Sequence, residues 1–145
     1  MKVWEALLQK GPSVHTVAAE GPLRAAIHKL VTAKIRALPV VEGDRLVGIV
    51  AVRDILARLD EHGGEALDHP VREMMTKDVV SVDRDVALEE VERLFVEHEI
   101  NHIPVVHDGK LVGVLTPLDV FGTHLDDVQW MNEHLRDYLH GVSFP

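Results

Sequence analysis

The sequence predicts a mixed α/β fold of the α+β type, built from two tandem copies of one unit that runs strand, helix, β-hairpin, helix. A shift of 65 residues aligns Pro39 with Pro104 and Asp54 with Asp119 without a gap. Alternating and β-branched runs predict the strands, and apolar residues spaced i, i+3, i+4, i+7 predict the helices. Because so long an ungapped register is improbable by chance, we infer an internal duplication.

Composition narrows the class of protein. The chain has 145 residues, 46% of them hydrophobic, which is enough for a buried core. It contains no cysteine, so disulfides, thiolate zinc sites and a cysteine nucleophile are excluded. A net charge of -9 argues against nonspecific binding to nucleic acid or to anionic membranes. The N-terminus lacks a signal-peptide pattern and no apolar run is long enough to cross a membrane, so we expect a cytoplasmic protein.

The repeats and their boundaries follow from the pattern. The first repeat is expected to span residues 1–62 and the second 71–125, joined by a polar linker at 63–70. An amphipathic helix and tail are expected at 126–145, where Trp130 marks either a dimer or partner contact or a cap on the subunit's own core. Within the repeats, helices and strands are expected at 3–10, 13–17, 22–31, 38–42, 46–50, 54–59, 79–82, 88–96, 103–107 and 111–115.

Two apolar runs joined by a turn, followed by a polar cluster, occur in both copies. In the second copy these segments are Ile103-Pro104-Val105-Val106 and 111–119, and in the first copy they are Leu38-Pro39-Val40-Val41, 46–50 and Asp54. A further segment, Met74-Met75-Thr76, precedes the second copy. The unit closely resembles a CBS domain, that is, a cystathionine-β-synthase-type domain, and the chain resembles a tandem pair without a fused effector. The resemblance covers roughly residues 3–123. It implies a pseudo-twofold body with two clefts between the copies, association into flat dimers, and binding of adenine nucleotides or adenosyl compounds.

The strongest candidate for ligand binding is Thr116-Pro117-Leu118-Asp119, which follows a strand and opens a helix. The Thr116 hydroxyl and the helix amides suit a phosphate group, and the Asp119 carboxylate suits two vicinal ribose hydroxyls. The resemblance assigns these roles to both residues. The same four residues also form an ordinary capping box that needs no ligand, and the motif alone does not separate the two interpretations.

The first copy departs from this pattern. Ala51 stands where the second copy has Thr116, whereas Asp54 matches Asp119. Arg53 either supplies a phosphate contact in place of the missing hydroxyl or is a solvent-facing helix residue. We therefore expect two unequal clefts.

The resemblance also implies a wall for each cleft. Leu38, Ile103 and the prolines would sandwich a base, or they simply pack the core. The implied wall residues are His15, Thr16, Ala37, Leu38 and Pro39 in the first cleft, and Val80, Ser81, His102, Ile103 and Pro104 in the second.

One motif suggests metal chemistry. His98-Glu99-Ile100-Asn101-His102 matches the H-E-x-x-H pattern of zinc metalloproteases, which requires both histidines on one helical face. Pro104 disfavours helix at the residue before it, so the helix is expected to end before His102. We predict neither a catalytic constellation nor a metal site.

The expectation for function is a non-enzymatic regulatory module. It requires no cofactor, binds AMP, ADP, ATP or S-adenosylmethionine, forms a homodimer and acts on an unknown effector protein rather than on nucleic acid or a membrane. One alternative is a dimerisation or docking scaffold whose vestigial clefts bind no nucleotide. The other is a metal-dependent hydrolase that uses His98 and His102.

Overall fold

The computed structural model describes residues 1–121, and the predicted C-terminal helix with Trp130 lies outside them. The chain divides into two compact units. The first-repeat unit comprises Ser13–Val80 and Asp108–Leu111. Of the described residues, the second-repeat unit comprises Met1–Pro12, Ser81–His107 and 112–121.

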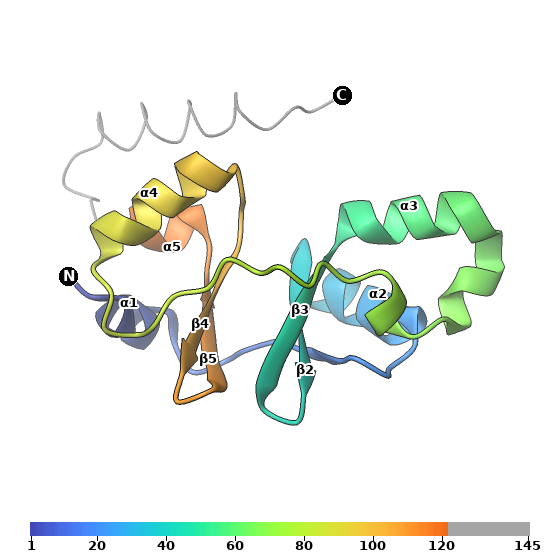
Figure 1. Ribbon diagram of the computed structural model, residues 1–145, viewed down its shortest axis with the longest axis horizontal. Coiled ribbons are helices and arrows are strands. Elements are labelled where there is room, and N and C mark those ends of the chain that lie inside the picture. Colours follow the sequence, from blue (N-terminus) through green and yellow to red (C-terminus); the bar gives the residue numbers. More distant parts are fainter. Residues whose placement is uncertain (122–145) are drawn as a thin grey trace. The chain divides into compact units, whose positions relative to one another are not determined.

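The first-repeat unit follows the predicted order of strand, helix, hairpin and helix (Figure 1). Its sheet has the order β1-β2-β3, with β1 parallel and β3 antiparallel to β2. Residues 63–70, expected as a linker, form mostly 3-10 helix. The elements are β1 (Val17–Ala18), α2 (Leu23–Ala33), β2 (Ala37–Glu42), β3 (Arg45–Ala51), α3 (Val52–His62), η1 (Gly63–Asp68) and η2 (Val71–Glu73).

The second-repeat unit repeats this order, with a shorter first strand. The strand expected at 79–82 is reduced to a single parallel bridge between Val82 and Val105. In Figure 1 the N-terminal helix lies with the elements of the second copy, although most of the chain separates them in sequence. The elements are α1 (Val3–Lys10), α4 (Leu88–His98), β4 (Ile103–His107), β5 (Lys110–Leu115) and α5 (Pro117–Phe121).

Each copy is completed by a segment from outside its strand-helix-hairpin-helix order: α1 at the N-terminus completes the second copy, and η2, which follows the first copy, completes the first. In the second-repeat unit the amide of Trp4 donates to the carbonyl of Arg84 at 3.0 Å. In the first-repeat unit the amide of Arg72 donates to the carbonyl of Ala19 at 2.9 Å. Because Arg84 follows Ala19 by one repeat length, Trp4 and Arg72 hold equivalent places in the two units.

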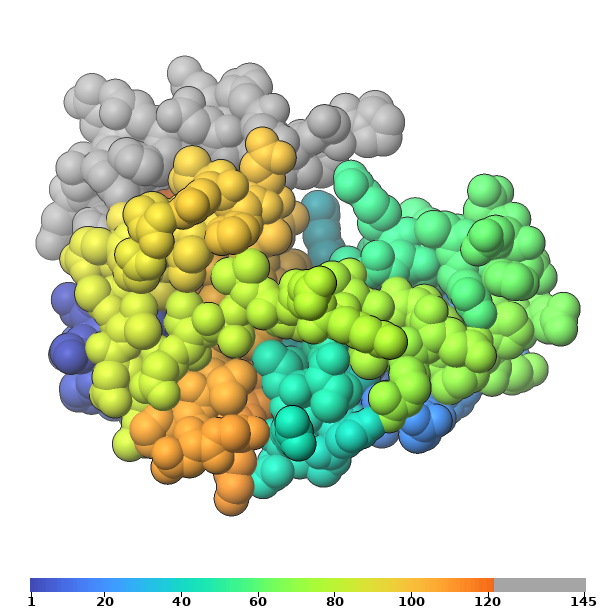
Figure 2. Space-filling view, viewed as in Figure 1, coloured from blue at the N-terminus to red at the C-terminus, as the bar shows by residue number. Residues whose placement is uncertain are grey.

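Each unit has its own apolar core. Phe95 and Ile103 are fully buried in the second-repeat unit, and Leu38 is fully buried in the first. Three apolar residues that the helical spacing includes in the predicted buried faces are exposed instead: Val31 by 71%, Leu56 by 60% and Val96 by 66%. Each lies at the edge of its helix's buried face, because successive helical residues turn by about 100°. The helix that carries Leu56 lies at the surface in Figure 2.

None of the helices within residues 1–121 is both long and apolar enough to cross a membrane.

Candidate functional site

The H-E-x-x-H segment does not form one helical face. Helix α4 ends at His98, and Glu99 adopts the left-handed conformation with φ 52°. His102 lies beyond that stop, immediately before β4. The prediction that the helix ends before His102 is confirmed: His98 is the last residue of α4, and His102 lies in the connection to β4.

In the first-repeat unit the sheet register gathers the candidate ligand residues at one end of the sheet. Ala37 lies opposite Ala51, the last residue of β3. Val17 pairs in parallel with Val40, which places the preceding residues, His15 and Thr16, beside the start of β2. Helix α3 begins directly after Ala51, so its first turn lies at the same end of the sheet.

The first turn of α3 carries Arg53 and Asp54. The Asp54 Oδ2 accepts a hydrogen bond from the Ala51 amide at 2.9 Å, which is the capping contact expected of an acid at this position. Arg53 is exposed. Within residues 1–121, no lysine or arginine forms an ion pair with Asp54.

In the second-repeat unit one carboxylate oxygen collects three donors. The Oδ2 of Asp119 accepts from the Thr116 amide at 2.8 Å and from the Thr116 hydroxyl at 2.9 Å. The Lys10 ammonium, on α1, donates to the same oxygen at 2.7 Å and to the Val114 carbonyl at 2.7 Å. The side chains of Lys10 and Asp119 are 31% and 20% exposed, so the ion pair is partly shielded from water.

The other oxygen of this carboxylate, Oδ1, receives no hydrogen bond from any residue in the described part of the chain. Asp119 can therefore accept one more hydrogen bond through Oδ1 and still accept the bond from the Thr116 amide that caps the helix. Thr116 holds its hydroxyl proton toward Asp119, and rotation about its side chain would redirect that proton to a ligand. The second copy thus combines a carboxylate, a hydroxyl and an ammonium, whereas the first has a carboxylate with a neighbouring exposed guanidinium.

The residues implied to sandwich a base are buried. Leu38 and Ile103 are 0% exposed and belong to the cores of their units. Pro39 and Pro104, which follow them, are also buried. In this conformation these four residues can meet a ligand only through backbone groups, unless their side chains move.

Of the remaining predicted wall residues, Ala37 is buried and the others lie nearer the surface. His15 and Ser81 are exposed, and Thr16, Val80 and His102 are partly buried. The carbonyl of Thr16 accepts a hydrogen bond from the Lys29 ammonium. Val80 belongs to the first-repeat unit, whereas the other wall residues of the second cleft belong to the second-repeat unit.

Lys10 was missed at the sequence level. It lies 109 residues before Asp119, and no local motif links the two. The only sequence indication is its position as the last residue of a predicted N-terminal helix, which does not reveal where that helix packs.

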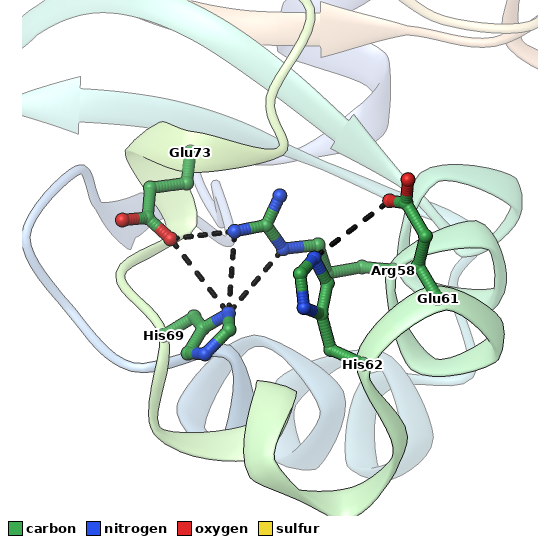
Figure 3. A network of polar contacts seen from close by, with 5 residues as sticks. All are labelled: Arg58, Glu61, His62, His69 and Glu73. Atoms are coloured by element: carbon green, nitrogen blue, oxygen red, sulfur yellow. Dashed lines mark hydrogen bonds and ion pairs between the residues drawn. The ribbon is translucent and has the colours of Figure 1, made fainter.

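A separate polar network joins α3 to η2 in the first-repeat unit (Figure 3). The Arg58 guanidinium lies 3.2 Å from His69 Nδ1 and donates to Glu73 Oε2 at 2.7 Å. His62 lies 3.8 Å from Glu61, an ion-pair distance if the imidazole is protonated. The guanidinium already balances the acidic charge here, so this network fastens the segment after α3 to that helix.

Comparisons with known proteins agree with the duplicated architecture. The family model for the CBS domain matches residues 10–61 and 71–124. Inosine-5′-monophosphate dehydrogenase of Methanocaldococcus jannaschii is 36% identical over 109 residues, which make up 74% of this chain and 21% of that enzyme. The chain spans between 21% and 60% of the length of the first curated relatives that it matches.

Solved structures match over most of the chain. A CBS-domain containing protein from Agrobacterium tumefaciens has 26% identity and a TM-score of 0.76, with 86% of this chain and 99% of that chain covered. CBSX2, solved in complex with AMP, has 30% identity and a TM-score of 0.74, with 86% of this chain and 96% of that chain covered.

Proposed function

Since this chain belongs to the CBS domain family, we propose that it senses an adenine nucleotide or adenosyl compound and thereby regulates a partner protein. CBS domains are regulatory, nucleotide-sensing modules, and one structural neighbour contains AMP. The match to inosine-5′-monophosphate dehydrogenase is confined to the CBS region of that enzyme, so it lends no support to dehydrogenase activity.

The observation that carries this proposal is the arrangement of Asp119, Thr116 and Lys10. The Asp119 Oδ1 is open to a ribose hydroxyl, and a carboxylate accepts hydroxyl donors well. The Lys10 ammonium, 2.7 Å from Asp119 Oδ2, supplies a cation beside that position. A ligand that places a ribose on Asp119 and a phosphate near Lys10 would satisfy both charges.

This arrangement favours AMP, ADP or ATP over S-adenosylmethionine. The sulfonium of S-adenosylmethionine is positive and would be repelled by the Lys10 ammonium, whereas a phosphate would be attracted. We rank the second cleft first. The first cleft is a weaker site that depends on Asp54 and Arg53.

The partner is a separate protein in the cytoplasm, and the module itself is a homodimer in this proposal. A ligand can regulate the partner only if it binds one shape of the module more tightly than another. Exposed apolar side chains on four helices offer surface for self-association or partner docking. They are Val31, Leu56, Val96 and Leu118, which are 71%, 60%, 66% and 68% exposed.

The second candidate function is a scaffold that dimerises or docks without binding a nucleotide. The full burial of Leu38 and Ile103 favours it, because these side chains are not open to a base. Sedimentation of the protein with and without AMP separates the two functions. The scaffold function is supported if the protein is a dimer whose mass and shape are the same with and without AMP, and if it does not bind AMP.

A thermal-shift panel of AMP, ADP, ATP, NAD, adenosine and S-adenosylmethionine tests the sensing function. A ligand at a hundred times its dissociation constant should stabilise the protein by about 2.7 kcal/mol. We expect shifts with the phosphorylated ligands and smaller ones with adenosine. In the Lys10→Met variant, the thermal shift caused by AMP should fall to the size of the shift caused by adenosine. No shift with any adenosyl compound would refute the proposal.

A further inference from the structure

Three side chains that can ligate a metal lie close together on the second-repeat unit. None of them belongs to the Thr116–Asp119 motif. They are Asp83, Asp85 and His107, and one ligand atom from each lies within 4.8 Å of the others. The Oδ2 of Asp83 lies 3.2 Å from His107 Nδ1, and its Oδ1 accepts from the Asp85 amide at 3.1 Å. No metal ligand set was predicted here, because H-E-x-x-H was the only such motif recognised.

The backbone fixes this grouping. Val82, which precedes Asp83, donates its amide to the Pro104 carbonyl at 3.1 Å and accepts from the Val106 amide at 2.9 Å. The chain around Val82 is thus hydrogen-bonded in parallel to β4, whose last residue is His107. Asp83 and His107 therefore lie on neighbouring chain segments that are hydrogen-bonded to each other.

The equivalent surface of the first-repeat unit also carries acidic side chains, and there a cation lies between them. Glu20 and Glu42 stand one repeat length before Asp85 and His107. The Arg72 guanidinium lies between them and donates to both, through Nε to Glu20 and through Nη2 to Glu42. The first-repeat unit therefore places a cation of its own between these two side chains.

The second-repeat unit lacks that cation. Trp4 holds the place of Arg72, since each donates its amide to the equivalent carbonyl, and an indole carries no positive charge. Across residues 1–121, neither Asp83 nor Asp85 forms an ion pair with a lysine or arginine. The same surface is thus acidic in both units, but only in the first does a guanidinium contact the acidic side chains directly; in the second, Arg84 acts on Asp83 without forming an ion pair.

We propose that Asp83, Asp85 and His107 bind a divalent transition-metal ion in the place that the Arg72 guanidinium takes in the first repeat. One imidazole nitrogen and two carboxylate oxygens suit zinc, cobalt or manganese better than magnesium or calcium, which prefer oxygen ligands alone. Hydrogen bonds from the Asp85 amide and then from His107 hold the pKa of Asp83 below its usual value. Water completes the coordination, because both aspartates are exposed. A metal on His107 Nδ1 takes the position of any proton there.

Zinc titration of the tag-free protein, stripped with EDTA and followed by competition with a chromophoric chelator, tests the site. Removing a ligand should weaken zinc binding at least about tenfold, so Asp83→Asn and His107→Gln should both do so. The matched control is His69→Gln, a histidine that already contacts the Arg58 guanidinium, and it should leave the tightest binding unchanged. Wild-type zinc affinity in both Asp83→Asn and His107→Gln would overturn the proposal.

A gain of charge gives an independent test. Trp4→Arg places a guanidinium where Arg72 lies in the first repeat and should compete with zinc, whereas Trp4→Phe should not. Manganese added to the labelled wild-type protein should broaden the amide resonances of residues 83–85 and 106–107 first. Broadening centred on other histidines would contradict the assignment, and circular dichroism confirms that each variant is folded.

Discussion

The ion pair between Lys10 and Asp119 should contribute measurably to stability. Exposed pairs couple by about 0.2–1 kcal/mol, and removing one partner from a buried pair costs about 3–5 kcal/mol. With side chains 31% and 20% exposed, and with solvent screening allowed for, we expect a coupling of about 1 kcal/mol. Lys10→Met alone should destabilise by about 1–2 kcal/mol, because the Val114 carbonyl also loses its donor.

Urea unfolding of the wild type, Lys10→Met, Asp119→Asn and the double variant gives this coupling as a double-mutant cycle. The matched control is Arg93 with Glu90, whose side chains are 56% and 45% exposed, and that cycle should give a smaller coupling. If the Lys10–Asp119 cycle gives no coupling beyond error, or no more than the control cycle, Lys10 does not hold Asp119 as described.

Three further predictions concern packing and charge. Gly48→Ala should destabilise by about 1–3 kcal/mol and Gly113→Ala by less, because a Cβ at Gly48 meets a backbone oxygen at 2.9 Å whereas one at Gly113 meets only a leucine side chain; equal losses in chemical denaturation would contradict this. Phe95→Ala should lower the free energy of unfolding by about 3–5 kcal/mol and Val96→Ala by less than about 0.5 kcal/mol, since these residues are 0% and 66% exposed. Thermal unfolding measures both losses, and a Phe95→Ala loss as small as that of Val96→Ala would contradict the assigned burial. The lowered pKa of Asp83 stabilises the fold above the ordinary aspartate range, and this contribution is lost as pH falls through its lowered pKa; the stability gap between wild type and Asp83→Asn should therefore narrow in acid, and a gap that widens there would refute the assigned cause.

Local signals in the sequence predicted most of the fold. The repeat register, the apolar spacing and the prolines placed the hairpins and the helices, and the capping pattern placed Asp119 on the Thr116 amide, as observed. The end of α4 before His102 was predictable for the same reason, since Pro104 restricts the residue before it. These features depend on residues within a few positions of one another.

Long-range packing could not be read in the same way. Nothing near Lys10 indicates that α1 packs with the second copy, and nothing near Asp83 indicates that His107 lies beside it. Burial at helix edges was also misjudged at Val31, because a hydrophobic residue one step off the packed face is as compatible with the pattern as one on it. Both kinds of error concern which surfaces meet, not which elements form.

The central claim is that Asp119 anchors an adenine nucleotide in the second cleft, and calorimetric titration of AMP into three proteins tests it directly. Wild type and Asp54→Ala should both bind AMP tightly, whereas Asp119→Ala, shown to be folded, should lose this binding. Equal AMP affinity in the wild type and Asp119→Ala would contradict the claim.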